Sequence, residues 1–380
     1  MASPVTPLPT ATAVNITDPY DNRGLVITNS ILASVICIVT IVGVLGNSFV
    51  ILLFALSRQL QTVTNIFVVS LTLSDLIGCA TLSLDAVALF SLRGWPLQDW
   101  VCKMVGAVTL IAFKASIVHL ALISINRLFV ITRPKIQYLR LYRHRNVVLM
   151  IGVAWLAPLT AIVLPPTLGF GRLGYNSDNH FCVFDGTRLQ LRIMYVIEEV
   201  LFVITFCIIS FCYLKIYIYV TRQYRNMMQF FLRRSNKAPA SNKKKMLSNI
   251  DKREIEITKN LFVVVCAYFI CILPHTICLF TEKCYLYYFK HTAVIYAINS
   301  CINPYIYCFK QPIFKQVSLC VVRCRWSEIP KPSAWLQRLL RRTRERGLSC
   351  TPTPDIIATQ VEQDISIVAT VQHTSVQTGV

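Results

Sequence analysis

Charged residues are scarce in this chain of 380 residues: they make up 15% of it, whereas apolar residues make up 54%. A typical soluble domain holds roughly 45–50% apolar residues. The composition therefore excludes a soluble protein, whose surface would have to carry the surplus. Acidic residues are the scarcer charged kind, since 38 Lys and Arg stand against 18 Asp and Glu, a net charge of +20. Apolar and basic residues must occupy separate places, as they do in a membrane protein.

Signatures of several other protein classes are missing. The first 28 residues hold no charged region followed by an apolar run, so no cleaved signal peptide is expected. The chain has no internal repeat and no inverted pair of broken helices, which a transporter would favour. No H-E-x-x-H motif occurs, and Asp75 and Asp85 lie on one predicted helix, which argues against an intramembrane enzyme. A membrane transporter or channel stays open as the alternative function.

Seven apolar runs are long enough to cross a bilayer, which takes about 20 residues. They predict an all-α membrane protein: a seven-transmembrane helix bundle over 29–309, followed by a short amphipathic cytosolic helix over 310–325 that lies on the membrane. The tails 1–28 and 326–380 are rich in polar residues and are predicted to be disordered. The predicted spans are 29–57, 64–91, 101–131, 147–168, 192–220, 256–280 and 290–309.

The basic residues predict the orientation of the bundle. Of the 38 Lys and Arg, 26 fall at one set of alternate ends, namely at Arg58 and within 133–145, 222–253 and 310–346. Only 7 fall at the opposite ends. Because cytosolic loops carry the excess of basic residues, the N-terminus is predicted outside the plasma membrane and the C-terminus in the cytosol. The charge is thus a record of topology, and no nucleic-acid partner is expected.

Two features of the external side agree with this topology. Asn15, in the triplet Asn15-Ile16-Thr17, is a glycosylation acceptor if the N-terminal tail is outside. Cys102 opens the third predicted span on the external side, and Cys182 lies in the second external loop. Because the exterior is oxidising, a disulfide between these two cysteines is expected to tie the loop over the mouth of the bundle.

Two features of the cytosolic tail indicate contact with the membrane. Cys320 and Cys324 follow the predicted amphipathic helix and are candidates for palmitoylation, with free thiols as the alternative. The basic cluster over 338–346 would favour anionic membrane lipid.

Each predicted span also carries a short motif. Taken in order, the seven motifs resemble those of the rhodopsin-like (class A) G-protein-coupled receptors across about 29–325. The pair Asn126-Arg127 is also similar to that of melatonin receptors and their orphan relatives. The motifs are Gly46-Asn47, Leu71-Thr72-Leu73-Ser74-Asp75, Asn126-Arg127-Leu128, Trp155, Tyr213, Cys271-Ile272-Leu273-Pro274, and Asn299-Ser300 with Asn303-Pro304-Tyr305-Ile306-Tyr307.

The resemblance implies a receptor and not an enzyme. An extracellular ligand would shift the bundle to a state that activates a heterotrimeric G protein, with the inhibitory type as the default expectation. The Ser and Thr residues of the tail imply a receptor kinase and arrestin as further partners. The ending Thr378-Gly379-Val380 fits a C-terminal motif that PDZ domains bind.

The resemblance also assigns residues to G-protein activation. Arg127 and Glu254 match an ion pair of the inactive state, which matters chiefly because it can break. Tyr213 and Tyr307 match tyrosines that stabilise the open state. Asn126 stands where the family usually has Asp, so the inactive state is expected to be held less firmly. The implied activation residues are Asn126, Arg127, Glu254, Tyr213, Asn303, Pro304 and Tyr307.

A sodium and water pocket is implied in the middle of the bundle. Asp75 is a lone carboxylate at mid-membrane and needs a cation or a proton. A sodium ion is therefore expected as an allosteric modulator, with a protonated carboxyl in a polar network as the alternative, and no other cofactor is expected. The residues that match this pocket are Asp75, Ser116, Asn299, Ser300 and Asn303.

The ligand pocket departs from two familiar types. The stretch 291–309 has no Lys for a retinal Schiff base, and Thr109 stands where monoamine receptors carry an Asp. Lys114 and Glu198 match in depth within about one turn, at ~19.5 Å and ~22.5 Å from the cytosolic motifs of their helices. One glutamate, Glu198 or Glu199, is expected to pair with Lys114, because successive helical residues point ~100° apart.

This ion pair is expected to form the floor of the pocket, where a polar ligand would disturb it; a purely structural ion pair is the alternative. His275 directly follows Pro274 and should face the pocket, unless it is a packing histidine. The ligand-binding candidates are Thr109, Lys114, Glu198, Glu199, His275 and Asp85.

Overall fold

A computed structural model describes residues 19–91, 94–234 and 249–345 of the chain. Most of these residues are helical, and two short strands form a hairpin between α5 and α6. The elements are α1 (Pro19–Leu56), α2 (Val63–Phe90), α3 (Asp99–Thr132), α4 (Lys135–Leu141), α5 (His144–Thr167), β1 (Arg172–Asn176), β2 (Phe181–Asp185), α6 (Arg188–Arg234), α8 (Asn249–Phe280), α9 (Glu282–Lys310), α10 (Pro312–Val322), a 3-10 turn (Trp326–Glu328) and α11 (Ala334–Glu345).

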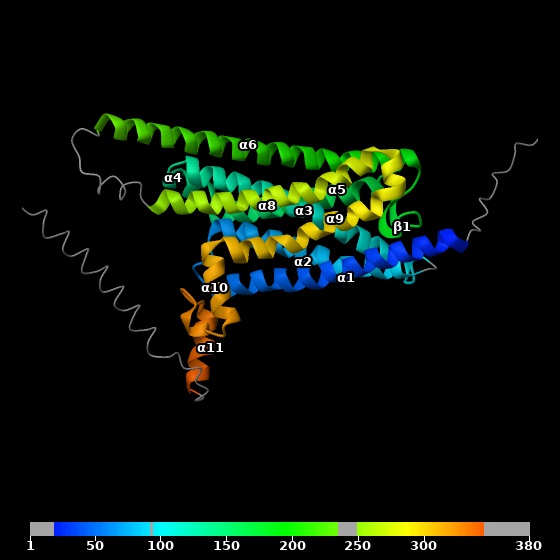
Figure 1. The fold of residues 1–380 in the computed structure, drawn as a ribbon, viewed down its shortest axis with the longest axis horizontal. Coiled ribbons are helices and arrows are strands. Elements are labelled where there is room, and N and C mark those ends of the chain that lie inside the picture. Colours follow the sequence, from blue (N-terminus) through cyan, green and yellow to red (C-terminus); the bar gives the residue numbers. More distant parts are fainter. Residues whose placement is uncertain (1–18, 92–93, 235–248, 346–380) are drawn as a thin grey trace, which may run out of the picture.

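The long helices run side by side and form the predicted seven-helix bundle (Figure 1). Among the described residues, α1, α2, α3, α5, α6 and α8 are long and apolar enough to span a membrane. The seventh helix, α9, packs against α8 and α1 and so closes the ring. α9 carries buried polar side chains such as Asn299 and Asn303. The prediction of an all-α seven-helix bundle is confirmed.

The first helix begins earlier than predicted. α1 starts at Pro19, so the prediction of disorder is wrong for residues 19–28. Proline is well suited to the first helical position, since its missing N–H would have no partner there. Farther along α1, Asn29 Oδ1 accepts a hydrogen bond from Lys290 Nζ at 2.8 Å, which holds the N-terminal part of α1 against α9. Asn15 lies outside the described residues.

The tail after α10 is also more ordered than predicted. The helix expected over 310–325 is present as α10, which begins with Pro312 at its first turn and ends at Val322. The 3-10 turn and α11 then follow, so the prediction of disorder from residue 326 is wrong as far as residue 345. Two apolar residues explain this order, because Ile329 and Leu336 are buried in the main core. The motif at 378–380 lies outside the described residues.

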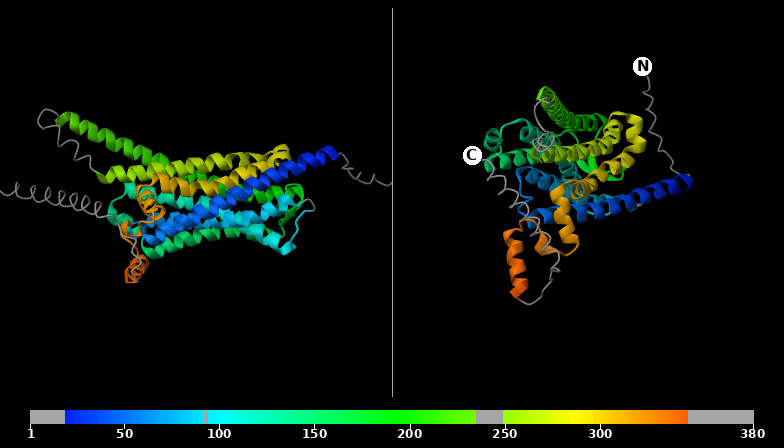
Figure 2. Two further views of the ribbon diagram at one scale, coloured as in Figure 1. Left: turned by 60° about the horizontal axis from the view of Figure 1, so that its bottom comes forward. Right: turned by 60° about the vertical axis from the view of Figure 1, so that its left-hand side comes forward.

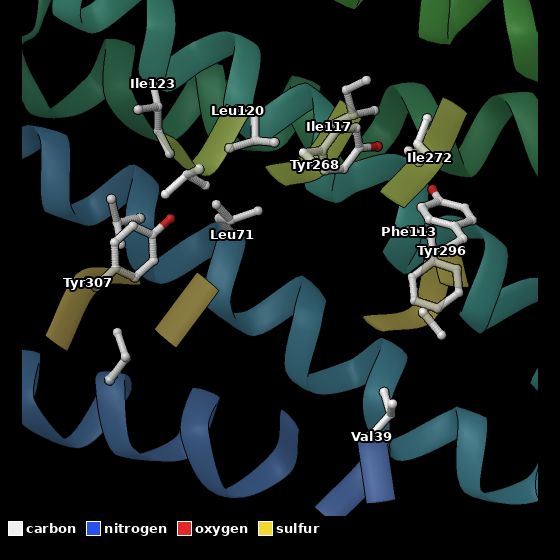
Figure 3. Packing of buried hydrophobic residues seen from close by; sticks show 14 of the residues in the cluster. Val39, Leu71, Phe113, Ile117, Leu120, Ile123, Tyr268, Ile272, Tyr296 and Tyr307 are labelled. Carbon is white, nitrogen blue, oxygen red and sulfur yellow. The ribbon is translucent and has the colours of Figure 1, made fainter. Parts of the chain in front are cut away.

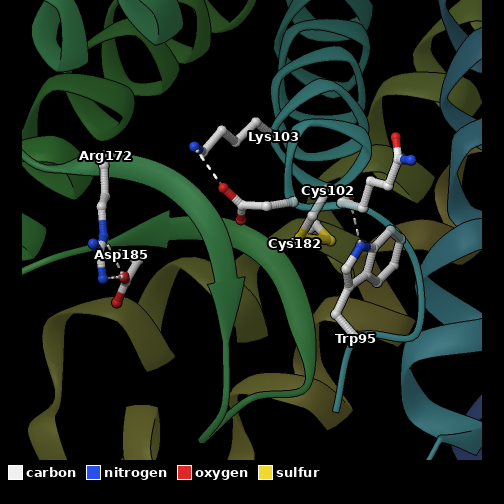
Figure 4. A network of polar contacts seen from close by, with 8 residues as sticks. Trp95, Cys102, Lys103, Arg172, Cys182 and Asp185 are labelled. Atoms are coloured by element: carbon white, nitrogen blue, oxygen red, sulfur yellow. Dashed lines mark hydrogen bonds and ion pairs between the residues drawn. A yellow bond between two sulfur atoms is a disulfide. The ribbon is translucent and has the colours of Figure 1, made fainter.

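The second external loop is an antiparallel hairpin that covers one end of the bundle. β1 pairs with β2 so that Tyr175 lies opposite Cys182. Cys182 forms the expected disulfide with Cys102 of α3, with the two Cα atoms 5.3 Å apart (Figure 4). The backbones meet closely here, since a Cβ on Gly106 would lie 2.6 Å from the Cys182 carbonyl oxygen. The disulfide prediction is confirmed.

The core lies where α2, α3, α8 and α9 meet. Ile117 of α3 and Tyr268 of α8 are in this cluster, and each is at most 1% exposed. Figure 3 shows Tyr307 near Leu71 in the same cluster, with Phe113, Ile272 and Tyr296 farther along it. This packing fixes the relative depth of the polar residues that α2, α3 and α9 carry.

Candidate functional site

Asp75 is the centre of a buried polar network in the middle of the bundle. It lies on α2 and is 0% exposed. Ser116 of α3 donates from Oγ to Asp75 Oδ1 at 3.0 Å. Asn303 of α9 donates from Nδ2 to Asp75 Oδ2 at 2.7 Å. Three helices thus meet at one carboxylate. Three of the five residues predicted for a sodium pocket are joined by these two hydrogen bonds, and the Ser300 side chain is a further hydrogen-bond partner of Asp75.

The other two predicted residues lie on α9 beside this network. Asn47 of α1 donates from Nδ2 to the Ser300 carbonyl at 2.9 Å, which binds α1 to α9. Asn299 Oδ1 and Asn303 Oδ1 are buried and have no hydrogen-bond partner among the described residues. A buried acceptor without a donor is unfavourable unless water or an ion binds it. The oxygen atoms of Asp75, Ser116 and these two amides are a donor set that suits a hard cation such as sodium.

A second buried charged group lies in the external half of the bundle. Lys114 Nζ on α3 is 3.7 Å from Glu198 Oε2 and 3.7 Å from Glu199 Oε1 on α6. The side chains are 9% exposed for Lys114 and 4% and 5% for the two glutamates. The expectation that only one glutamate reaches the lysine is wrong. Both glutamates reach it because the long lysine side chain ends between two residues that point in different directions.

The charge balance of this triad, defined as Lys114, Glu198 and Glu199, is uneven. Two carboxylates face one ammonium, and neither contact is as short as a hydrogen bond between charged groups, about 2.7–2.9 Å. Glu198 Oε1 and Glu199 Oε2 are buried and have no hydrogen-bond partner among the described residues. The triad therefore brings two carboxyl groups, one ammonium group and two unsatisfied oxygen atoms together among buried side chains.

Aromatic rings pack around His275, where α8 meets α9. His275 of α8 lies 5.6 Å from the Tyr296 ring and 5.1 Å from the Phe289 ring, measured between centroids. Its Nδ1 is 3.1 Å from Thr292 Oγ1. The ring centroids of Phe113 and Tyr296 are 4.9 Å apart. His275 thus packs against α9, as the packing alternative expected.

Two further predicted residues hold the external end together. Thr109 Oγ1 donates to Thr81 Oγ1 at 2.7 Å, which joins α3 to α2. Asp85 Oδ1 accepts the Cys182 backbone N–H at 3.2 Å, which joins α2 to the hairpin. These contacts give Thr109 and Asp85 structural partners on α2 and in the hairpin.

At the end of the bundle opposite the hairpin, the predicted activation residues are spread over α3, α6, α8 and α9. Asn126 Oδ1 accepts from Thr64 Oγ1 at 2.6 Å, and Asn126 Nδ2 donates to Tyr138 Oη at 3.2 Å. Arg127 next to it is 4% exposed. The side chain of Glu254, in α8, lies outside the described residues. Pro304 lies close to α1, since a Cβ on Gly46 would be 3.2 Å from the Pro304 Cβ.

Tyr213 of α6 and Tyr307 of α9 are the two predicted tyrosines of this region. The Tyr307 side chain is 0% exposed, and its hydroxyl has no hydrogen-bond partner in the described part of the chain. Tyr213 lines a cavity of about 530 Å³ between α6 and α8, together with Phe206, Phe262 and Phe269. The cavity indicates that α6 and α8 pack loosely against each other.

Two polar clusters of the structure were not predicted from the sequence. Asn179 of the hairpin donates from Nδ2 to Tyr285 Oη at 3.0 Å, and that hydroxyl lies 3.2 Å from Tyr195 Oη. These residues come from the hairpin, α9 and α6, and no spacing in the sequence connects them. The second cluster joins His119 to Ser70 and Trp155. A histidine in a predicted span was a signal for it, because ionisable groups there need partners.

Comparisons with known proteins agree on one family. The model of the seven-transmembrane receptors of the rhodopsin family matches residues 46–307. The chain is similar to melatonin receptor type 1B-B of Danio rerio, 32% identical over 199 residues that make up 52% of this chain and 56% of that receptor. It is also similar to the melatonin receptor type 1B of Homo sapiens, 27% identical over 88% of each chain. The chain thus spans little more than half of the first relative and most of the second.

The fold has a counterpart among solved structures. The crystal structure of squid rhodopsin aligns with a TM-score of 0.66 over 87% of this chain and 93% of that one, at 23% identity. At this identity the likeness concerns the arrangement of the helices alone.

Proposed function

The chain belongs to the rhodopsin family of seven-transmembrane receptors, and we propose that it couples an extracellular ligand to a heterotrimeric G protein at the plasma membrane. Its N-terminus faces the outside and its C-terminus the cytosol, as the basic loops require. The observation that carries the proposal is the row of buried polar side chains along α3, from Lys114 through Ser116 to Arg127. This row joins the external half of the bundle to its cytosolic end. The family match favours a receptor over a transporter or channel.

Activation opens the cytosolic end around Arg127. The cavity between α6 and α8 supports this step, because little apolar contact has to be broken for the two helices to separate. Asn126 is neutral, so it cannot act as a charge partner of Arg127. Its hydrogen bonds to Thr64 and Tyr138 hold α3 against these two residues. These two hydrogen bonds keep α3 in place while α8 moves. Glu254, Tyr213, Asn303, Pro304 and Tyr307 complete the proposed activation residues.

Nucleotide exchange tests this function. The full-length receptor, reconstituted in vesicles, should accelerate exchange on a purified G protein of the inhibitory type above the other subtypes, and Arg127→Ala should remove the acceleration. Failure to accelerate exchange on any subtype, together with ion flux through the same vesicles, would contradict the proposal in favour of a channel.

The ligand is proposed to act on the triad Lys114, Glu198 and Glu199. Because two carboxyl oxygens of the triad have no hydrogen-bond partner among the described residues, a ligand with a positively charged group that can donate hydrogen bonds would satisfy them best. Such a group would compete with Lys114 for the carboxylates and loosen the link between α3 and α6. Thr109, His275 and Asp85 would shape the pocket beside it.

Substitutions at the triad test the ligand proposal. Lys114→Ala leaves two buried carboxylates with no cation, so α3 and α6 should separate and basal exchange should rise, within the roughly 5–150-fold range typical of allosteric coupling. Lys103→Ala is the matched control, because Lys103 lies on the same helix in an exposed pair with Asp99. Basal exchange in Lys114→Ala equal to that of the control would leave the triad a purely structural ion pair.

A sodium ion is proposed as an allosteric modulator at Asp75. The three helices that meet there support it, because an ion bound between them would hold them together. Ser116, Asn299, Ser300 and Asn303 would supply the remaining oxygen atoms.

Several partners and modifications complete the proposal. A receptor kinase and arrestin would act on the cytosolic tail, and a PDZ protein would bind its end. Asn15 would carry a glycan outside the cell. Cys324 is exposed, as palmitoylation requires, whereas Cys320 is half-buried and lies 3.7 Å from the Glu328 carbonyl. Cys324 is therefore the better palmitoylation site of the two.

A further inference from the structure

The segment after α10 returns to the cytosolic end of α1. Arg58 donates its backbone N–H to the Lys331 carbonyl at 2.9 Å, and Ser333 donates its N–H to the Leu56 carbonyl at 2.8 Å. Ser57 lies between these contacts and donates from Oγ to the Pro330 carbonyl at 2.6 Å. The segment 329–333 is thus held like a short strand against the turn that follows α1, and it fixes where α11 begins.

α11 has two apolar faces, and the bundle covers only one of them. Leu336 is 1% exposed and belongs to the main core, and Leu340 packs against that core from the next turn. Trp335 is 60% exposed and Leu339 is 46% exposed. Residues four positions apart share a helix face, so Trp335 and Leu339 form an apolar stripe beside the buried one. A water-exposed Trp next to a Leu is unfavourable unless something apolar covers it.

Basic residues border this exposed stripe. Arg338 and Arg342 are exposed, and their spacing places them on the side of α11 that carries Trp335 and Leu339. Long arginine side chains can extend from an apolar boundary to reach a polar layer. The pattern of Trp and Leu with flanking Arg is that of a helix lying in the membrane interface.

The position of α11 matches this pattern. Figure 1 shows α11 at the cytosolic end of the bundle, beside α10, with its axis across the direction of the long helices. Figure 2 shows it projecting beyond the edge of the bundle in both further views. Because its axis crosses the direction of the long helices, a helix placed there would run parallel to the plane of a bilayer that the bundle spans, outside the space that the bundle fills.

We propose that α11 is a second membrane-surface helix, which inserts Trp335 and Leu339 into the cytosolic leaflet and binds anionic phospholipid headgroups through Arg338 and Arg342. The cytosolic leaflet is the negatively charged one, so its charge complements these arginines. The contacts at 329–333 hold α11 at the end of α1, and lipid binding secures its outer side. This function is independent of the ligand and of the G protein.

Quenching of tryptophan fluorescence tests the proposal on the full-length receptor in lipid nanodiscs. The signal of Trp335 is the difference between the receptor and its Trp335→Phe variant. Brominated acyl chains should quench this signal, and the quenching should be stronger in discs that contain phosphatidylserine than in discs of phosphatidylcholine alone. Arg338→Gln/Arg342→Gln should abolish the difference between the two lipid compositions.

A matched variant controls for loss of charge. Arg140→Gln/Arg143→Gln removes the same two charges from exposed positions near α4 and should keep the phosphatidylserine effect. Unquenched Trp335 in brominated discs would overturn the proposal and leave an acidic protein partner as the occupant of this face. An equal loss of the phosphatidylserine effect in the α4 control would overturn the role of Arg338 and Arg342.

Discussion

At the scale of single residues, His119 shows what a fully satisfied buried polar group looks like in this protein. Its Nδ1 is 2.7 Å from the Ala115 carbonyl, which can only accept, so Nδ1 is the donor. Nε2 then accepts from Ser70 Oγ at 2.7 Å, and Trp155 Nε1 donates to the same hydroxyl at 3.2 Å. Every group has a partner, which identifies the cluster as structural. Asn299 and Glu199 differ, since each keeps an unsatisfied oxygen where we propose that an ion or a ligand binds.

His119→Ala should destabilise the bundle without changing the proposed ligand site. The substitution leaves Ser70 with one partner fewer between α2, α3 and α5. Hydrogen bonds between membrane helices contribute about 0.6 kcal/mol on average and at most about 1.7, so the thermal midpoint of the purified receptor should fall modestly. Trp155→Phe keeps an aromatic ring and removes one donor, so it should cost less. A midpoint in His119→Ala equal to that of the unchanged receptor would refute this account.

His180, in the external hairpin turn, should make that loop sensitive to acid. Burial, and then the charge of Lys290, lower the pKa of His180 below its ordinary value, while Asp178 opposes them. The folded loop therefore favours neutral His180, whose Nδ1 lies 2.9 Å from Tyr175 Oη. The stabilisation is complete above about pH 6.5, the pKa of an unfolded histidine. It is lost as the pH falls below that value toward the lowered pKa.

Hydrogen exchange of the hairpin amides checks the sign of this effect. Exchange should become faster between neutral and mildly acidic pH, after correction for the intrinsic rate. His180→Asn removes the titration and tolerates the positive φ of 56° at this position, since Asn adopts that conformation more readily than most residues. The variant should show no such acceleration; the same pH dependence in both proteins would exclude His180 as its cause.

At the scale of elements, the sequence predicted what hydrophobicity alone determines. The seven spans follow from apolar runs, and α10 follows from its own amphipathic pattern. The hairpin and α11 were missed because both depend on contacts far along the chain. The predicted disulfide links Cys182 to Cys102 of α3, 80 residues earlier, but it does not indicate that β2 pairs with β1. α11 is ordered by Leu336 in the core and by the turn at Arg58, and neither contact is visible in its local composition.

The junction of α3 and the hairpin should tolerate no side chain at Gly106. A Cβ there would lie 2.6 Å from the Cys182 carbonyl oxygen, a backbone atom that cannot rotate away. Gly106→Ala should therefore displace the hairpin and reduce the free energy of unfolding by about 1–3 kcal/mol, as at other overpacked sites. The thermal midpoint of the receptor should fall accordingly. Gly152→Ala is the matched control in α5, because nothing lies within 4 Å of its Cβ. Equal midpoints for the two variants would contradict the close approach.

At the scale of the whole molecule, the order of the helices along the chain made it possible to predict which distant residues lie at the same depth in the bundle. Lys114 and Glu198 are 84 positions apart, and their common depth followed from counting turns above the cytosolic motifs. The contact with Glu199 did not follow, because helix geometry gives the direction of a residue but not the reach of its side chain. The sequence also predicted Asp85 and Thr109 as ligand contacts, and it did not show that Asp85 binds the hairpin and Thr109 binds α2.

Sodium should act on the whole bundle through Asp75. An ion bound where α2, α3 and α9 meet would favour the closed arrangement, so sodium chloride should raise the thermal midpoint and lower basal nucleotide exchange relative to choline chloride. Asp75→Asn removes the charge that holds the ion and should abolish both effects. Asp85→Asn is the matched control, since Asp85 is a buried aspartate of the same helix that accepts a hairpin N–H instead. Asp85→Asn should keep both sodium effects. An Asp75→Asn receptor that still responds to sodium would show that Asp75 is a protonated member of a polar network.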